Sequence, residues 1–231
     1  VYQNICSKSS SDSRPDASTE AGDCTLRVAS RPNAGYNPPS LRPTTYEREF
    51  MTIKIVTDTG SDIPPDWLAA YDIHLVPLVL RFGNREVEDN ETTRAELWQR
   101  VEAGLPCETS GPPVGAYGAA FAPLVDSGNQ VLCITLPAAH SVTYNSAWLA
   151  AQNYPDQIEV VDGRSVSLGY GLQAIKAAQM AAAGADLTTI AAALRDMQSR
   201  ITIRFFLESL DQVKRGGRLD ALIPVMSRLG Q

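Results

Sequence analysis

Three turns of this sequence gather small side chains that carry hydroxyl groups. They lie at residues 57–61, 109–110 and 141–143, and each comes directly before a segment with helical character. Because a helix N-terminus presents unpaired N–H groups and a partial positive charge, hydroxyls placed there can bind an anion such as a carboxylate or a phosphate. The competing interpretation is that Ser141 and Thr143 only cap the following helix, with His140 a solvated loop residue.

Ser141 beside His140 also allows another chemistry, in which a serine nucleophile and a histidine base carry out acyl transfer. This interpretation is weaker, because the sequence has no Gly-x-Ser-x-Gly turn and its other histidine, His74, falls in a predicted strand. The four cysteines show no Cys-x-x-Cys spacing and have no histidine partners, so we expect no metal site and no disulfide framework. We predict no cofactor, no catalytic residue and a reducing, cytoplasmic location.

The segments around the turns alternate between strand and helix patterns from residue 52 onward. This alternation predicts an α/β fold with a largely parallel sheet flanked by helices. In such a sheet, ligands usually bind where the strands end, and the turns at 57–61 and 141–143 both follow predicted strands. The predicted strands are Ile53 to Thr57, His74 to Phe82, Val131 to Leu136, Ile158 to Val161 and Ile201 to Leu207. The predicted helices are Pro65 to Tyr71, Thr93 to Ala103, Gly115 to Val125, Thr143 to Asn153, Val166 to Ala183 and Leu187 to Arg200.

Several residues mark the ends of these helices. Thr93 followed by Glu96 fits a capping box, and Asp186 fits an N-cap. Three glycines fit helix C-termini, at positions 104, 128 and 184. Gly169-Tyr-Gly171 resembles part of a dinucleotide fingerprint, but it lies inside a helical pattern, so we assign it no nucleotide.

Residues 1–50 differ in composition from the rest. They are rich in serine and proline, poor in large apolar residues and without periodic pattern, so they cannot bury enough apolar surface to offset the entropy of ordering. We expect this segment to be disordered. The abrupt change at Met51 raises the hypothesis that Met51 is the initiator and that residues 1–50 are an untranslated or non-native extension. A tryptic peptide from residues 15–42 of the native protein would rule that hypothesis out.

The charge balance argues against a nucleic-acid partner. The chain has 20 Lys and Arg against 26 Asp and Glu, and six of each lie in residues 1–50, so the net charge of −6 belongs to residues 51–231. Proteins that bind nucleic acid are usually basic, and only the segment from Lys214 to Arg218 is locally cationic. No stretch approaches the roughly 18 to 20 apolar residues that a membrane span requires, so we expect no stable membrane insertion.

Five motifs in register resemble the DegV family, bacterial proteins that bind one fatty acid and present its carboxylate to an acyl kinase. The family's Thr-Asp-Ser-Thr-Ser-Asp-Leu matches Thr57-Asp-Thr-Gly-Ser-Asp-Ile63, and its Val-Pro-Leu strand matches Val76-Pro77-Leu78. Its Thr-Ser-Gln-Pro turn matches Thr109-Ser-Gly-Pro112, and its Asp-Ser-Arg-Ser-Val-Ser turn matches Asp162-Gly-Arg-Ser-Val-Ser167. Its Leu-Arg-Lys-Gly-Gly-Arg-Ile matches Val213-Lys-Arg-Gly-Gly-Arg-Leu219. Each motif alone is weak, but together they cover residues 52–231.

The resemblance implies a lipid-binding protein of phospholipid metabolism, with a fatty acid as ligand and with catalysis supplied by the partner kinase. It also implies a DegV-type fold in which residues 51–200 form the N-terminal α/β domain. Residues 201–231 would begin a second domain that is mostly missing, so the chain is expected to be truncated at its C-terminus. The resemblance places Thr109, with its neighbour Ser110, on the acyl carboxylate, and it places Arg218 at the mouth of the site or on the partner surface.

The sequence departs from the family pattern in the loop that should supply a second hydroxyl. The family usually reads Ser-Ser-Gly-Leu-Ser-Gly-Thr-Tyr, whereas this chain reads Pro137-Ala-Ala-His-Ser-Val-Thr-Tyr144. Ala138 therefore stands where a serine is expected to meet the ligand, and the loss of one hydrogen bond to a charged group costs roughly 1.5–3 kcal/mol unless it is replaced. His140, Ser141 or backbone N–H groups are the candidates for replacement, and Thr143 of the same loop is also expected to contact the ligand. A degenerate paralogue with a regulatory role is a further alternative.

Overall fold

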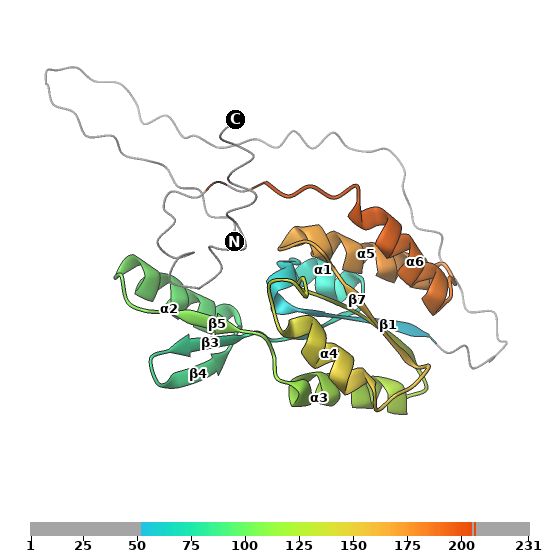
Figure 1. Ribbon diagram of the computed structural model, residues 1–231, viewed down its shortest axis with the longest axis horizontal. Helices are drawn as coiled ribbons and strands as arrows, with labels where there is room; N and C mark the ends of the chain where they lie inside the picture. The colour runs from blue at the N-terminus through green and yellow to red at the C-terminus, as the bar shows by residue number, and fades with distance from the viewer. Residues whose placement is uncertain (1–51, 205, 207–231) are drawn as a thin grey trace, which may run out of the picture. The chain divides into compact units, whose positions relative to one another are not determined.

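A parallel sheet of four strands forms the centre of the computed structural model, which describes residues 52–204 and residue 206 (Figure 1). The strand order is β2-β1-β6-β7, all parallel. The bounds are β1 Ile53–Asp58, β2 Ile73–Val76, β6 Gln130–Thr135 and β7 Ile158–Asp162. The expected α/β fold with a parallel sheet and flanking helices is thereby confirmed.

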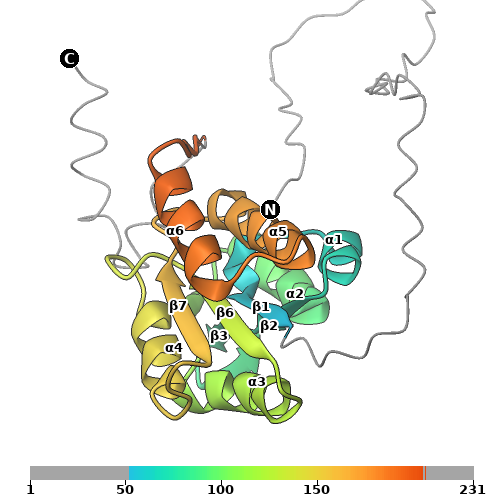
Figure 2. The ribbon, with the colours of Figure 1, turned by 90° about the vertical axis from the view of Figure 1, so that its right-hand side faces the viewer.

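Helices cover both faces of this sheet. Figures 1 and 2 show α1, α5 and α6 on one face and α3 and α4 on the other. Their bounds are α1 Pro65–Ala70, α3 Val114–Asp126, α4 Thr143–Ala151, α5 Leu168–Ala182 and α6 Leu187–Gln198. Because side chains alternate along a strand, β6 sends Leu132 and Ile134 into the core with α5 and α6, and Val131 and Cys133 into the core with α3 and α4.

A second, antiparallel sheet was not expected from the sequence. Its strand order is β4-β3-β5, with β3 Val79–Phe82, β4 Arg85–Glu88 and β5 Glu108–Ser110. Helix α2, Glu91–Glu102, connects β4 to β5. The single strand predicted from His74 to Phe82 was wrong, because it is divided between the two sheets.

The division falls at Pro77, and its cause is local. Proline has no N–H to donate to a strand ladder. The next residue, Leu78, donates its N–H to the Thr59 hydroxyl at 3.0 Å and accepts from the Asp89 N–H at 2.8 Å, so its backbone is paired outside the main sheet. The chain therefore leaves the parallel sheet and enters the small one.

The helix ends mostly follow the predicted signals. Asp186 caps α6, with its carboxylate accepting from the Thr189 N–H at 2.9 Å. The glycines at positions 104, 128 and 184 follow helix ends with positive φ angles, which glycine adopts without strain. The predicted start of α2 was wrong: the capping box joins Asn90 to Thr93, not Thr93 to Glu96. Asn90 is a strong N-cap residue, so it begins the helix two residues earlier.

The predicted strand at 201–207 is not seen in the part that the structure describes. Residues 201–204 and 206 have no strand pairing, and the sheet ends at β7 among the described residues. The predictions for residues 1–51, the cationic segment 214–218 and Arg218 all lie outside the described residues. No helix within the described ranges combines the length and apolarity needed to cross a bilayer.

Candidate functional site

Two of the predicted hydroxyl-bearing turns meet at one cavity of about 200 Å³. We call it the head-group cavity. Four predicted site residues line it: Thr109 and Ser110 from the end of β5, and His140 and Ser141 from the loop after β6. The rest of its wall comes from Leu78, Gly111, Leu136, Pro137 and Val166. Hydroxyl and imidazole groups therefore line a largely apolar hollow beside the carboxyl end of the central strand.

The strand β5 sets the place of Thr109. Thr109 pairs with Leu80 of β3, and this ladder carries its exposed side chain to the edge where β6 ends. The turn after it approaches α4 closely: a Cβ on Gly111 would lie 2.8 Å from the Thr143 Oγ1 and 2.9 Å from a Val142 methyl carbon. A side chain at position 111 would require Thr143 and Val142 to move, so glycine fits here where the resembling motif has glutamine.

Ser141 contacts the start of α4 as well as the cavity. Its hydroxyl accepts from the Thr143 N–H at 3.2 Å and forms a second hydrogen bond with the Thr143 hydroxyl. The N-cap residue itself is Val142, which has no capping side chain, so Ser141 takes over part of the capping role from one residue earlier. Thr143 is fully buried and does not line the cavity.

The loop that replaces the family's serine pair is held by its backbone. Ala138 is exposed and lies outside the cavity lining, and its N–H donates to the Asp162 carboxylate at 3.3 Å. The N–H groups of His140 and Ser141 both donate to the Pro137 carbonyl at 3.0 Å. This tight turn points residues 140 and 141 back toward the cavity.

Asp58 was not among the predicted site residues, but it stabilises this edge of the sheet through buried hydrogen bonds. It ends β1, is fully buried, and accepts three hydrogen bonds: from the Tyr170 hydroxyl at 2.5 Å, the Gly60 N–H at 3.0 Å and the Leu136 N–H at 3.1 Å. Burial raises the pKa of Asp58 from 3.8 to about 6, although the hydrogen bonds oppose that shift. The sequence held one signal for this role of Asp58, a carboxylate directly after an apolar strand. It could not reveal the partner, because Tyr170 lies 112 positions away.

The raised pKa of Asp58 predicts a pH dependence of stability. Because the folded pKa exceeds the unfolded value of 3.8, the stabilising contribution is complete below about pH 3.8 and is lost as the pH rises through about 6. The gap between the two values corresponds to about 3 kcal/mol. The groups facing Asp58 are Tyr170, Tyr117 and Cys133, whose pKa values burial raises, so they stay neutral and do not offset this effect.

Urea unfolding of the wild type and of Asp58→Asn between pH 4 and pH 7 measures this effect. We expect the stability of the wild type, relative to the variant, to fall by about 2 kcal/mol across this range, since the rest of the change lies below pH 4. A difference in unfolding free energy that stays constant with pH would contradict the raised pKa of Asp58.

A second buried network joins the main sheet to the small one. The Thr59 hydroxyl donates to the Asp89 carboxylate at 2.6 Å, and Arg94 donates to Asp89 at 2.6 and 2.9 Å and to the Thr59 carbonyl at 2.9 Å. Asp89 raises the pKa of Arg94 through these hydrogen bonds. The third predicted hydroxyl-bearing turn, which includes the 3-10 helix η1 at Thr59–Ser61, is thus used for structure at Thr59 and does not line the head-group cavity.

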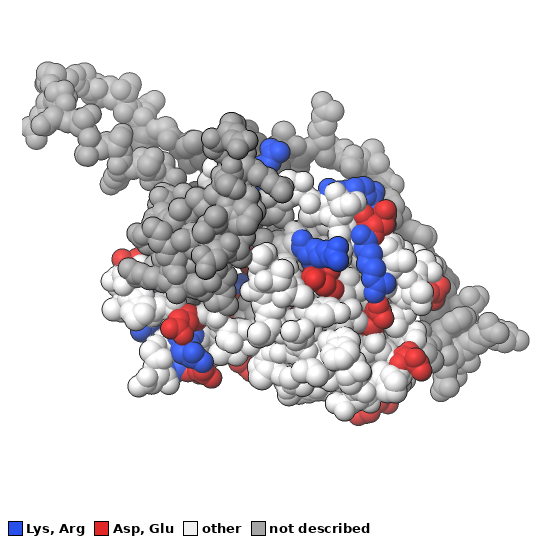
Figure 3. Space-filling view, viewed as in Figure 1, with Lys and Arg blue, Asp and Glu red and all other residues white. Residues whose placement is uncertain are grey.

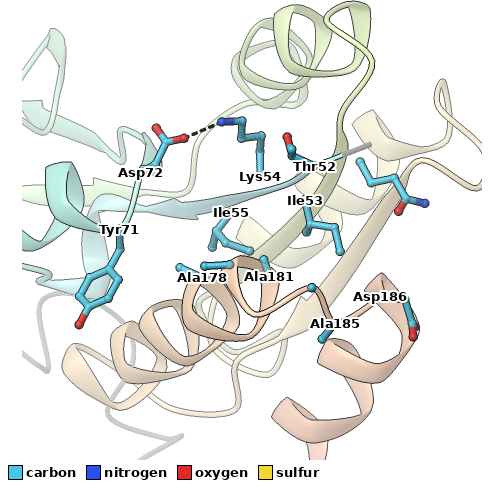
Figure 4. Close-up of a pocket in the computed structure, with 13 residues that line it drawn as sticks. Thr52, Ile53, Lys54, Ile55, Tyr71, Asp72, Ala178, Ala181, Ala185 and Asp186 are labelled. Atoms are coloured by element: carbon cyan, nitrogen blue, oxygen red, sulfur yellow. Dashed lines mark hydrogen bonds and ion pairs between the residues drawn. The ribbon is translucent and has the colours of Figure 1, made fainter. Parts of the chain in front are cut away.

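Size alone does not identify the binding site. A cavity of about 580 Å³ lies at the opposite end of β1, walled by alanines of α5 (Figure 4). Its charged groups are already engaged, since Lys54 pairs with Asp72 at 2.6 Å and Asp186 caps α6. A further cavity, of about 480 Å³, is lined by apolar residues, Ile63, Leu68, Leu75 and Pro77 among them, and by charged residues, namely Asp62, Asp89, Glu91 and Arg94. Consecutive residues line the two cavities: Pro77 lines this one, and Leu78 lines the head-group cavity.

The geometry does not favour the alternative chemistries. No hydrogen bond joins His140 to Ser141 in the described part of the chain, and the Ser141 hydroxyl is engaged with Thr143. Within the same residues no group of three or more metal-ligating side chains comes together. On the face shown in Figure 3, Lys and Arg lie beside Asp and Glu and form no wide basic patch.

Comparisons with known proteins agree with this architecture. A "DegV domain-containing protein" of Deinococcus radiodurans is 34% identical over 172 residues, which are 73% of this chain and 61% of that protein. A DegV family protein from Thermus thermophilus, described by its fatty acid binding, matches with a TM-score of 0.69 and 30% identity over 75% of this chain and 64% of that one. DegV of Bacillus subtilis, described as a fatty acid binding protein, matches with a TM-score of 0.68 and 28% identity over 77% and 64%.

The chain spans about three fifths of the length of the curated relatives that it matches. The sequence profile of one family, described as uncharacterised proteins of the DegV family, matches residues 52–230. Since that match covers well over half of the sequence, the chain belongs to the DegV family.

Proposed function

We propose that this protein binds a long-chain fatty acid and presents its carboxylate to a partner acyl kinase. One observation carries the proposal: Thr109 and Ser110 of one turn and His140 and Ser141 of another line the same cavity at the carboxyl end of the sheet. The T. thermophilus and B. subtilis relatives, both described by fatty acid binding, support the choice of ligand.

The chemistry of the head-group cavity suits a carboxylate. Hydroxyl groups donate to carboxylate oxygens, and hydrogen bonds to a charged group are stronger than those between neutral groups. The hydroxyls of Thr109 and Ser110 are exposed at the cavity, and the first turn of α4 adds a helix N-terminus beside Ser141. Ala138 provides no hydroxyl, so Ser141 and His140 replace the missing serine in this proposal.

The size of the cavity separates the head group from the acyl chain. A volume of about 200 Å³ is below the roughly 300–1,000 Å³ of pockets that enclose whole ligands, so the acyl chain must continue elsewhere. The neighbouring cavity of about 480 Å³ offers apolar side chains from Ile63, Leu68 and Leu75 on one part of its wall, the rest of which includes charged residues. An acyl chain that passes Leu78 and Pro77 would enter it.

The proposed partner is the one that the family resemblance implies, and the site is compatible with it. Its side chains can hold and orient a carboxylate, but Ser141 is paired with Thr143 and not with a base. In this proposal, chemistry at the carboxylate belongs to the kinase subunit that the resemblance implies. Ser110 and His140 are exposed, which leaves the carboxylate end open to such a partner.

Two measurements on the same preparation test this proposal. Mass spectrometry of organic extracts should find co-purified fatty acids, and titration calorimetry of the delipidated protein should show tighter binding of palmitate than of 1-hexadecanol, which lacks the charge. We expect a preference of about tenfold or more, since hydrogen bonds to a charged group are about twice as strong as neutral ones. Extracts without acyl chains, together with equal affinity for both ligands, would refute the proposal.

A further inference from the structure

The loop after β6 is held between two aspartates that end the neighbouring strands. Asp58, at the end of β1, accepts the Leu136 N–H at 3.1 Å. Asp162, at the end of β7, accepts the Ala138 N–H at 3.3 Å. Since β6 lies between β1 and β7 in the sheet, the two carboxylates bind backbone amides of the loop from opposite sides. The bound amides belong to the residues directly before and after Pro137.

Both aspartates are themselves fixed by their surroundings. Asp162 also accepts the Arg164 N–H at 3.0 Å, which closes a turn with Arg164 at a φ of 48°. The Asp162 carbonyl accepts from the Gln198 side chain at 2.7 Å. Asp58 is fixed by Tyr170 and Gly60, so neither carboxylate depends on the loop for its own position.

Helix α5 contacts both the turn after β1 and the turn after β7. Tyr170 donates to Asp58, and Gln173, one turn later on the same face, donates to the Gly163 carbonyl at 2.7 Å. Gly163 touches the end of β6, since its N–H donates to the Thr135 carbonyl at 3.0 Å and a Cβ there would lie 2.5 Å from that oxygen. One rigid helix thus sets the spacing of the two carboxylates.

We propose that Asp58 and Asp162 are positioning residues, which hold the backbone amides of Leu136 and Ala138 so that His140 and Ser141 face the head-group cavity. The effect on ligand affinity rests on the fatty-acid function proposed above. The effect on the loop itself does not, because it is a property of the free protein. In this chain the loop lacks the glycines and the serine pair of the family pattern, and the two carboxylates fix its backbone conformation.

The test uses variants that change one aspartate at a time. Asp162→Ala removes the acceptor for the N–H groups of Ala138 and Arg164, whereas Asp162→Asn keeps a side-chain oxygen there. Asp58→Asn keeps one oxygen for Tyr170 and Gly60 and turns an NH₂, which cannot accept, toward Leu136. Asp126→Ala is the matched control, since Asp126 is an exposed carboxylate at the far end of α3.

Two readouts on the full chain separate positioning from a merely structural role. Amide hydrogen exchange should be about tenfold faster at Ala138 in Asp162→Ala and at Leu136 in Asp58→Asn, with the strands unaffected. The affinity for palmitate should fall about tenfold in both variants, and that for 1-hexadecanol by less than threefold. Asp162→Asn and Asp126→Ala should stay within threefold of the wild type for both ligands.

Each outcome decides the proposal. Unchanged exchange at Leu136 and Ala138, or equal losses for both ligands, would overturn it. If the wild type binds neither ligand while the exchange rates change as expected, loop positioning stands and the fatty-acid function fails.

Discussion

Replacing Thr109 with valine and Ser141 with alanine together is expected to lower the affinity for palmitate by about a hundredfold or more. Each hydroxyl lines the head-group cavity, and each is assigned one hydrogen bond to the carboxylate. The loss of a hydrogen bond to a charged group costs roughly 1.5–3 kcal/mol, which is about a 10- to 150-fold change in affinity for each residue. Isothermal titration of the delipidated variant measures the change.

The control for this double variant carries the same two chemical changes away from the cavity. Thr188→Val and Ser127→Ala alter exposed residues on α6 and at the end of α3. This control should bind palmitate as the wild type does. For the double variant, the loss with 1-hexadecanol should be at least tenfold smaller than the loss with palmitate, since the alcohol brings no charge. Equal losses for the two ligands would show that the variant had damaged the cavity and not the carboxylate contact.

Gly171→Ala should destabilise the fold by about 2–3 kcal/mol, a cost typical of overpacking in a close-packed interior. A Cβ on Gly171 would lie 2.5 Å from the Ser61 carbonyl oxygen and 3.0 Å from an Ile63 side-chain carbon. The first contact is with backbone, so it cannot be relieved by a side-chain rotation. Helix α5 would have to move away from η1, and Tyr170 would move with it.

Gly118→Ala is the matched control, because Gly118 also lies inside a helix and a Cβ there would meet nothing within 4 Å. It should stabilise the protein by about 0.5–1 kcal/mol, since alanine favours a helix over glycine. Chemical denaturation of both variants measures the two changes. The same sign in both would contradict the close approach of α5 to η1.

The fold of the described residues could largely be predicted from the sequence, because its elements carry strong periodic signals. The apolar runs at 53–57 and 131–136 are typical of buried parallel strands, and α2, α3, α5 and α6 are 12–15 residues long. The small sheet was missed for a physical reason: β5 is only three residues long, all of them polar and exposed, and it is a strand only because β3 lies beside it. Pro77 did mark the break in the preceding strand, but the apolar run continues through it.

The candidate site was predictable where residue type and position along a strand are enough. Thr109 and Ser110 meet Ser141 at one cavity. Both turns carried the predicted signal of hydroxyls directly before a helix, but only the turn at 141–143 follows a predicted strand. The hydrogen bonds that hold these turns in place were not predictable, because they join residues far apart in sequence. Asp58 pairs with Tyr170 across 112 positions, and Ala138 pairs with Asp162 across 24. The two glycines around Tyr170 allow close packing, since a Cβ on Gly169 would meet the Ser165 side chain and one on Gly171 the Ser61 carbonyl.

A crystal structure of the protein with bound palmitate tests the central claim most directly. We predict that a carboxylate oxygen lies within hydrogen-bond distance, roughly 2.5–3.0 Å, of the hydroxyls of Thr109 and Ser141. The acyl chain should lead away past Leu78. A carboxylate bound elsewhere, for example at Lys54 in the opposite cavity, or methylene groups filling the space between Thr109 and Ser141, would contradict the proposed function.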